Sequence, residues 1–354
     1  MSSLLFFDPV CQQPYDTRTL MERATGGTEA TVTRIADALG AYVMQHNRTR
    51  DEGRYRVPGP LDGIRNVVLV RESRALPRVR ELFPQARVCL WLHDQLNPGS
   101  KRARRLAGTA AVLRQMGVTV VCVSDSQRRG VAAVLERLGV AAEVRALTIY
   151  NPVDDALAPD GTPVDPDKLV FFSSPNKGLA FTMDAFGALH RAMPRLRLVV
   201  ANPGYKADRA ARRAGVQFLG ALPQARVHAE VRGALCTFFP NFRIPETFGL
   251  VFAESHALGT PVLTVDCGAA LEVLGDPREV LPLRTGYRVY ESALRRLGPG
   301  LRRVPARLAA AGGLFDEFVE RISLWRSGAR PQVAPDPRFR LAAVAAQWRG
   351  LLGQ

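Results

Sequence analysis

The stretch from Pro245 to Val262, PETFGLVFAESHALGTPV, decides what kind of fold this sequence can form. An apolar run ending at Phe238-Phe239-Pro240 precedes it, and its Gly-Thr-Pro turn leads into another apolar run, Val262–Val265. A strand, a loop, a helix, a turn and a second strand in this order form a βαβ unit, whose two strands are parallel. The stretch therefore predicts a parallel sheet covered by helices.

The rest of the chain repeats this alternation of short β-branched runs and helical patterns. In the first half we expect strands at Leu4–Asp8, Ala41–His46, Asn66–Val70, Val88–Leu92, Thr119–Ser124 and Ala146–Tyr150, and helices at Glu29–Leu39, Arg102–Met116 and Ser126–Leu138. In the second half we expect strands at Leu169–Ser173, Leu196–Ala201, Val216–Leu219, Leu235–Phe239 and Val262–Val265, and helices at Leu179–Met193, Gln224–Gly233 and Phe248–Leu258. Such alternation predicts an α/β protein with two successive doubly wound parallel sheets.

One segment breaks the alternation and divides the chain. Residues 151–167, NPVDDALAPDGTPVDPD, hold four prolines and five aspartates and have no apolar period, as expected of a linker. We therefore expect an N-terminal domain over residues 1–152 and a C-terminal domain over 153–338. Residues 339–354 form a helical pattern with Trp348 on its apolar stripe, which we expect to pack back on the N-terminal domain. Asp165-Pro166-Asp167 has the form of a DxD metal motif, but its place in the linker argues against that role.

The composition is that of a globular protein. Its 354 residues suit two domains, and 47% hydrophobic with 23% charged residues excludes the disordered and disulfide-stapled classes. No run approaches the ~18 apolar residues of a membrane span. The start, Met1–Asp8, has no basic region before its apolar residues, so we expect no signal peptide and a cytoplasmic location. The five cysteines are widely spaced without a Cys-x-x-Cys pair, so we expect no structural metal.

The strongly basic charge balance favours anionic partners. Lys and Arg number 48 against 33 Asp and Glu, a net charge of +15, which attracts nucleotides, phosphates, anionic lipids or nucleic acids. Dispersed arginines, 7% aromatic residues and the lack of a helix-turn-helix or RNP-like motif argue against nucleic acid. The basic segment Gly99–Arg105 suits either peripheral contact with an anionic membrane surface or a solvated helix face.

Two glutamates flank the helix start in the opening stretch. Glu246 precedes the helix and Glu254 lies about two turns inside it. The N–H groups of Gly249 and Leu250 can bind a diphosphate at the helix N-terminus, while the carboxylates can accept hydrogen bonds from sugar hydroxyls. Two glutamates at this spacing are also common on solvated helices. Within this stretch, however, the arrangement favours a nucleotide-sugar site.

PETFGLVFAE followed by ALGTPV resembles the corresponding stretch of the retaining glycosyltransferases of family 4, the group 1 glycosyltransferases. The resemblance covers most of the chain and is densest from Leu169 to Val265. It implies the GT-B fold, in which two Rossmann-like domains face a central cleft. The C-terminal domain then binds a nucleotide-diphosphate sugar and the N-terminal domain an acceptor, and the hexose is transferred with retention and without a metal or other cofactor. The sugar, the base and the acceptor, whether carbohydrate, lipid-linked or a small molecule, stay open.

The resemblance also implies roles for single residues. Lys177 in Ser173–Leu179 stands where the family has a lysine that binds the donor diphosphate. The family's preceding arginine is missing here, so either Ser174 hydrogen-bonds the phosphate or a different arginine takes its place. His93, after the strand Val88–Leu92, stands where the family has a histidine close to the transferred sugar. The implied catalytic residues are His93, Glu246 and Lys177, and the implied donor-binding residues are Gly26, Gly27, Ser174, Lys177, Glu246, Thr247, Phe248, Gly249, Leu250 and Glu254.

No side chain of this set is an obvious nucleophile, which favours a front-face substitution in which the departing phosphate accepts the acceptor's proton. Three other interpretations remain open. A nucleotide-sugar 2-epimerase of the same fold would share the donor contacts but would transfer no sugar to any acceptor. A basic nucleic-acid-binding protein would show steep salt dependence and no affinity for nucleotide sugars. A non-catalytic relative is compatible with the missing arginine.

Overall fold

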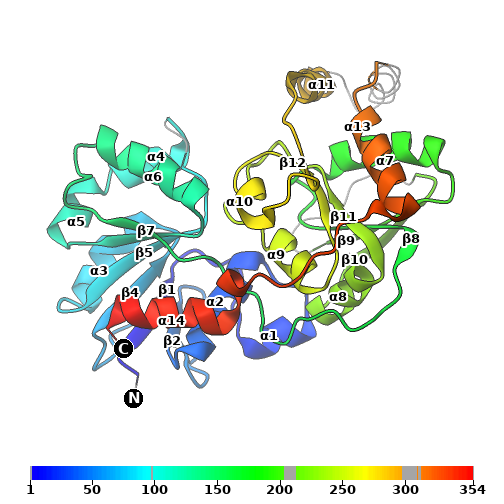
Figure 1. Cartoon of the computed structure of the whole chain (residues 1–354). Coiled ribbons are helices and arrows are strands. Elements are labelled where there is room, and N and C mark those ends of the chain that lie inside the picture. The colour runs from blue at the N-terminus through cyan, green and yellow to red at the C-terminus, as the bar shows by residue number, and fades with distance from the viewer. Residues whose placement is uncertain (1, 97–98, 203–212, 297–308, 310–311, 354) are drawn as a thin grey trace. The chain divides into compact units, whose positions relative to one another are not determined.

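The computed structural model describes residues 2–96, 99–202, 213–296, 309 and 312–353. The chain divides into two compact units (Figure 1). The first unit comprises Met1–Met21, Gly26–Ala156 and Pro337–Gln354, and the second comprises Glu22–Thr25 and Leu157–Asp336. Each unit is described on its own.

The first unit is built on a sheet of seven parallel strands in the order β3-β2-β1-β4-β5-β6-β7. These strands are β1 (Leu4–Asp8), β2 (Tyr42–Gln45), β3 (Tyr55–Arg56), β4 (Asn66–Val70), β5 (Arg87–Leu92), β6 (Thr119–Cys122) and β7 (Ala146–Thr148). The order runs outward in both directions from β1 and β4, so their carboxyl ends form a topological switch point. Ligands of open parallel sheets bind at such points.

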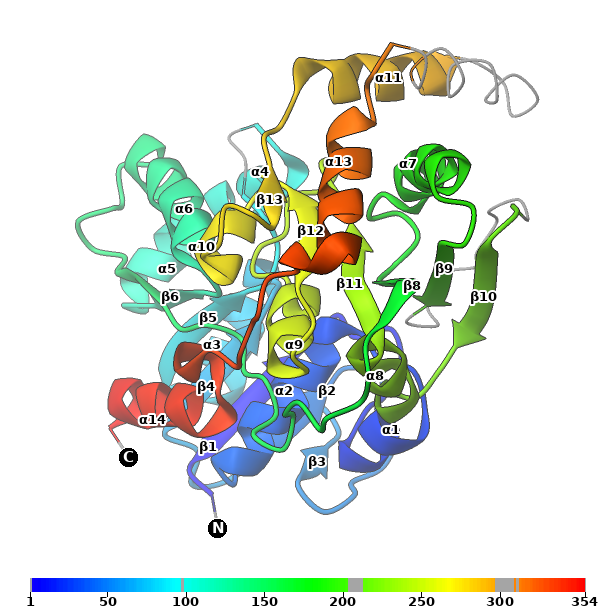
Figure 2. The same ribbon diagram turned by 45° about the vertical axis from the view of Figure 1, so that its right-hand side comes forward.

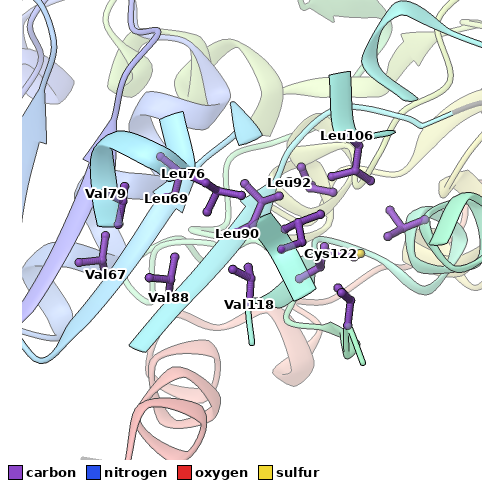
Figure 3. Packing of buried hydrophobic residues seen from close by; sticks show 14 of the residues in the cluster. Val67, Leu69, Leu76, Val79, Val88, Leu90, Leu92, Leu106, Val118 and Cys122 are labelled. Atoms are coloured by element: carbon purple, nitrogen blue, oxygen red, sulfur yellow. The ribbon is translucent and has the colours of Figure 1, made fainter. Parts of the chain in front are cut away.

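Helices cover this sheet and close its core. They are α1 (Thr17–Glu22), α2 (Gly27–Ala38), α3 (Leu76–Leu82), α4 (Lys101–Ala107), α5 (Ala110–Gln115), α6 (Asp125–Arg137) and α14 (Leu341–Leu352), with short 3-10 turns η1 (Ser73–Ala75) and η4 (Pro337–Phe339). Figure 3 shows how Leu69, Leu90 and Cys122 of the sheet pack with Leu76 and Leu106 from the helices. Burial of such apolar side chains is the main favourable contribution to folding.

The C-terminal helix α14 belongs to the first unit and packs on α2 (Figures 1 and 2). Its Trp348 is fully buried, with its ring centroid 5.9 Å from that of Phe6 and 5.0 Å from that of Trp91. Just before the helix, Arg340 pairs with Val153 in an isolated bridge. The apolar stripe around Trp348 therefore completes the core of the first unit.

The second unit has a sheet of six parallel strands in the order β10-β9-β8-β11-β12-β13. They are β8 (Asp165–Phe172), β9 (Arg197–Asn202), β10 (Val216–Ala221), β11 (Ala234–Phe239), β12 (Val262–Val265) and β13 (Val280–Leu281). Its helices are α7 (Leu179–Ala192), α8 (Gln224–Arg232), α9 (Leu250–Ala257), α10 (Ala270–Leu274), α11 (Thr285–Arg296) and α13 (Asp316–Leu324), followed by the π-turn η3 (Trp325–Ala329). The strand order places the switch point of this sheet between β8 and β11.

The two parallel sheets confirm the predicted fold class, while several local predictions were wrong. The helix expected over Arg102–Met116 is two helices, α4 and α5, separated at Gly108-Thr109. The helix expected from Phe248 begins at Leu250. The structure also contains β3, α1 and α3, which the sequence analysis did not predict. Of the helical segment expected over residues 339–354, residue 354 lies outside the described residues.

The expected linker is shorter than predicted, because β8 already begins at Asp165. The DxD sequence therefore lies at the amino end of a strand, not in the linker. Asp165 forms an ion pair with Arg197 at 2.5 Å, and Asp167 pairs with Arg195 at 3.0 Å and with Arg326. These carboxylates therefore bind arginines at the amino edge of the sheet, opposite the edge at which the carboxyl ends of the strands lie.

Within the described ranges, none of the helices combines the length and the apolar character needed to cross a bilayer.

Candidate functional site

The loops after β8 and β11 form the candidate site of the second unit. Residues 173–178 follow β8 and lead into α7, and residues 240–249 follow β11 and lead into α9. β8 and β11 are neighbours on the two sides of the switch point. Both loops therefore emerge at the carboxyl edge of the sheet, where parallel α/β sheets bind ligands.

An ion pair joins these two loops. Lys177 Nζ lies 2.9 Å from Glu246 Oε2, although the residues are 69 positions apart in the sequence. The lysine side chain is 32% exposed, whereas the glutamate side chain is only 6% exposed. Two residues that the sequence analysis assigned to one site therefore lie in direct contact, and the lysine side chain is partly exposed.

The lysine is presented by a tight turn at the start of α7. The N–H of Lys177 donates to the carbonyl of Ser174 at 2.9 Å, and the Ser174 hydroxyl contacts the side chain of Asn176. Gly178 follows with φ 94°, a left-handed conformation that favours glycine. Ser174 is buried, and its hydroxyl stabilises the turn through its contact with Asn176. Its predicted role as a phosphate ligand stays a prediction.

Asn241 organises the second loop, and the sequence analysis missed it. Its Nδ2 donates to the carbonyl of Ile244 at 2.7 Å and contacts Glu246 Oε1 at 3.5 Å, while its Oδ1 accepts from the N–H of Arg243 at 3.1 Å. The residue is 3% exposed. An asparagine directly after a strand that ends in Phe-Phe-Pro is a typical turn former, and this signal was available in the sequence.

Gly268 fixes the main chain of Glu246, and it too was missed. The two residues form an isolated parallel bridge, and the carbonyl of Glu246 accepts from the N–H of Ala269 at 3.0 Å. Gly268 has φ 76°, and a Cβ there would lie 2.3 Å from the oxygen and 2.7 Å from the nitrogen of Glu246. Only glycine allows this close approach of two backbone segments.

The start of α9 provides main-chain N–H groups next to this ion pair. Gly249 has φ 90°, and a Cβ at this position would lie 2.4 Å from the ring of Phe252. The first N–H groups of a helix have no acceptor within the helix, and here these are the N–H groups of Leu250 and Val251, whereas the N–H of Phe252 donates to the carbonyl of Gly249 at 2.9 Å. The Phe248 side chain is fully buried and Thr247 is half-buried, so Phe248 can offer a ligand only its backbone.

Glu254 occupies a different environment from Glu246. It lies in the middle of α9, is 6% exposed, and its Oε2 is 3.9 Å from Nε2 of His228 in α8. His228 is likewise buried, and the sequence analysis did not single it out. The helix therefore carries one carboxylate before its start and a second one buried beside an imidazole.

Three sequence-predicted residues belong to the first unit. Gly26 precedes α2 and Gly27 is its first residue, while His93 follows β5. The ring centroids of His93 and Trp91 are 4.5 Å apart. Burial, aided by the cation of Arg71, holds the pKa of His93 well below its usual range, so the imidazole is neutral near pH 7.

No group of three or more His, Cys, Asp or Glu side chains suited to hold a metal ion occurs among the residues that the structure describes.

Comparisons with known proteins address the fold first. HepE of Anabaena, in complex with UDP-glucose, superposes with a TM-score of 0.62 at 15% identity and covers 99% of both chains. Sucrose-phosphate synthase of Thermosynechococcus elongatus superposes with a TM-score of 0.61 at 18% identity, covering 99% of this chain and 98% of that one. The fold is GT-B. The sequence-based prediction of the fold is thereby confirmed.

Sequence comparisons match part of the chain. Residues 166–295 match the family model described as glycosyl transferases group 1. A phosphatidyl-myo-inositol mannosyltransferase of Mycobacterium tuberculosis is 32% identical over 181 residues, which cover 47% of this chain and 46% of the relative. The match thus spans less than half the length of that curated protein. Lys177, Glu246 and Glu254 all lie inside the region that matches the group 1 model.

Proposed function

We propose that the protein is a retaining glycosyltransferase of family 4 that transfers a hexose from a nucleotide-diphosphate sugar to an acceptor hydroxyl. The contact between Lys177 and Glu246 at the start of α9 carries this proposal. It brings together a partly exposed lysine side chain, a buried carboxylate and helix N–H groups within the segment that matches group 1 glycosyltransferases. These are the groups that a diphosphate linked to a sugar requires.

In donor binding, the lysine, the helix N–H groups and the two glutamates each bind a different part of the nucleotide sugar. The ammonium of Lys177 and the N–H groups of Gly249 and Leu250 bind the diphosphate, because both carry positive charge toward the carboxyl edge of the sheet. Glu246 accepts hydrogen bonds from hydroxyls of the sugar. Glu254, deeper in the helix, accepts hydrogen bonds from the ribose hydroxyls.

The same groups assist the reaction. The bond between the anomeric carbon and the diphosphate oxygen breaks, and negative charge develops on the leaving group, where Lys177 and the helix start stabilise it. The acceptor oxygen bonds to the anomeric carbon from the same face, and its proton passes to the departing phosphate. Glu246 is a poor nucleophile, because its two oxygens contact Lys177 Nζ and Asn241 Nδ2. The geometry therefore favours front-face substitution over a glycosyl–enzyme intermediate.

The reaction, as proposed, requires no metal, since Lys177 and the helix N–H groups supply the positive charge that a divalent cation would provide. Neutral His93 helps to orient the sugar as a hydrogen-bond partner. The acceptor belongs to polysaccharide, lipopolysaccharide or glycolipid assembly. The mannosyltransferase name of the matching relatives supports a hexose donor and a lipid-linked acceptor.

The test is nucleoside diphosphate release from UDP-glucose and GDP-mannose, with and without candidate acceptors, in the presence of EDTA. We expect acceptor-dependent release, retained anomeric configuration by NMR, and a large loss of turnover in Lys177→Met. Lys168→Met is the matched control, because Lys168 is also ion-paired, to Glu230 at 2.5 Å, but lies within β8. Conversion of the nucleotide sugar into its 2-epimer with no transfer to any acceptor would indicate a 2-epimerase, and a trapped glycosyl–enzyme would contradict front-face substitution.

A further inference from the structure

The first unit contains a pocket of 260 Å³ at the carboxyl edge of its sheet. Its walls come from the segments that follow β1, β4 and β5, from Thr28 at the start of α2, and from α4. It therefore lies at the switch point between β1 and β4. Its volume is below the roughly 300–1,000 Å³ of pockets for drug-sized ligands, so it suits a single small ring.

Every arginine on the wall of this pocket is held by a carboxylate. Arg102 Nε lies 2.9 Å from Asp94 Oδ2, and Arg105 Nη1 lies 3.1 Å from Glu72 Oε2. Arg71 Nη2 lies 2.7 Å from Asp8 Oδ2 and 3.3 Å from Glu29 Oε1. The three guanidinium groups therefore face four carboxylates, although the chain as a whole carries a charge of +15.

This pairing decides which ligand the pocket can bind. A phosphate would have to compete for the arginines with carboxylates that stay in place and repel it. A hydroxyl needs no such exchange, because it can accept from a guanidinium and donate to a carboxylate at the same time. The paired arginines and carboxylates thus offer a neutral ligand many hydrogen-bond donors and acceptors, while the wall of the pocket carries little net charge.

The remaining wall is apolar. Val10, Leu92, Leu96 and Leu106 line the pocket beside the charged pairs. Leu92, Leu96 and Leu106 are at most 5% exposed, so this surface is fixed by the core. A sugar or cyclitol ring has hydroxyls around its rim and C–H groups on its faces. Its hydroxyls can therefore bind the charged pairs while its C–H groups contact the apolar side chains.

The backbone of Arg71, in the wall of this pocket, has a strained conformation that the surrounding structure maintains. Its φ is 68°, and among the described residues it is the only non-glycine with a positive φ. Its N–H donates to the carbonyl of Trp91 at 2.8 Å, and its side chain is 19% exposed. Strained backbone of this kind persists where the surroundings over-determine it, and it clusters at binding sites.

We propose that this pocket binds a neutral polyhydroxylated ring, a monosaccharide or a cyclitol, of the molecule that receives the sugar. The role of that ring as acceptor rests on the proposed function, but its binding does not. Arg105 donates hydrogen bonds to the hydroxyls of the ring, and Glu72 accepts hydrogen bonds from them. A phosphate group of the same molecule then lies outside the pocket.

The experiment compares binding of D-mannose and myo-inositol with that of mannose 6-phosphate and inositol 1-phosphate to the full chain, by saturation-transfer NMR and calorimetry. We expect at least one neutral ring to bind in the millimolar range, and its phosphate to bind no more than about threefold tighter. Glu72→Gln and Arg105→Gln each weaken neutral binding by about tenfold, equivalent to about 1.4 kcal/mol. Arg78→Gln leaves it unchanged, because Arg78 pairs with Glu81 on the surface of α3 away from the pocket.

Two results would overturn the inference. One is a phosphate ester that binds the wild type more than about threefold more tightly than its neutral parent does. The other is no binding of either neutral ring at about 50 mM, at which a millimolar site is filled. Neither requires a variant to fold, since the wild-type comparison alone decides between neutral and phosphorylated rings. UDP and GDP titrations in the same samples separate the two proposals: nucleotide binding without ring binding refutes only the pocket, and the reverse refutes only the donor site.

Discussion

Replacing Gly268 with alanine tests whether the position of Glu246 matters. An alanine Cβ would lie 2.3 Å from the carbonyl oxygen of Glu246 and would have to move to an ordinary contact of at least 3.4 Å. The main chain of Glu246 is therefore displaced by about 1 Å, a shift that can lower turnover by about 10²-fold when it moves a substrate-binding group. The variant should bind nucleoside diphosphates almost normally, because Lys177 and the start of α9 are unchanged.

Gly275→Ala is the matched control. Gly275 has φ 71°, close to the 76° of Gly268, but a Cβ there meets nothing within 4 Å. Both variants lose about 1–2 kcal/mol from left-handed strain, and Gly268→Ala loses a further 1–3 kcal/mol from overpacking. Urea unfolding measures the two stabilities, and donor turnover with calorimetry of UDP and UDP-sugar measures the site. If Gly268→Ala matched Gly275→Ala in stability and turnover, the reasoning about this backbone contact would be refuted.

Four further outcomes are expected. Lys177→Met weakens binding of the nucleoside diphosphate by about 10- to 100-fold in calorimetry, since a hydrogen bond to a charged group contributes about 1.5–3 kcal/mol. Glu254→Ala raises the Kd for nucleotide, whereas Glu246→Ala mainly lowers kcat; unchanged kinetics in both variants would remove the site assignment. In an NMR titration the His93 imidazole does not take up a proton near pH 6.5, where a free imidazole does, because burial lowers its pKa. On acidification the His93 side chain binds a proton in the unfolded chain but not in the folded chain, so the free energy of unfolding falls. Between pH 7.5 and 5.5 the wild type therefore loses about 1.4 kcal/mol of stability that His93→Asn does not lose. A His93 signal that titrates near pH 6.5 would contradict this.

Much of the fold follows from the periodicity of the sequence alone. Leu4–Asp8 and Asn66–Val70 are continuous apolar runs between turn residues, and they are strands over those same residues. The break between α4 and α5 was missed because Gly108 and Thr109 interrupt a continuous helical pattern without a proline. The start of β8 was misplaced because Asp165 and Asp167 look like linker residues, and only their arginine partners from distant segments make a strand there favourable.

The candidate site was predictable in its location but not in its contacts. Parallel strands place Lys177 and Glu246 at one edge, because each follows a strand of the same sheet. Their direct contact depends on the turns made by Asn241 and on the close approach of Gly268, and neither is encoded in a local pattern. Likewise, the spacing between Glu246 and Glu254 does not say that the second carboxylate is buried beside α8.

A crystal structure of the chain with bound uridine or guanosine diphosphate tests the central claim most directly. The account predicts a phosphate oxygen about 2.7–3.1 Å from Lys177 Nζ and another at the same distance from the N–H of Gly249 or Leu250. A nucleotide bound elsewhere, or none at saturating concentration, would contradict it.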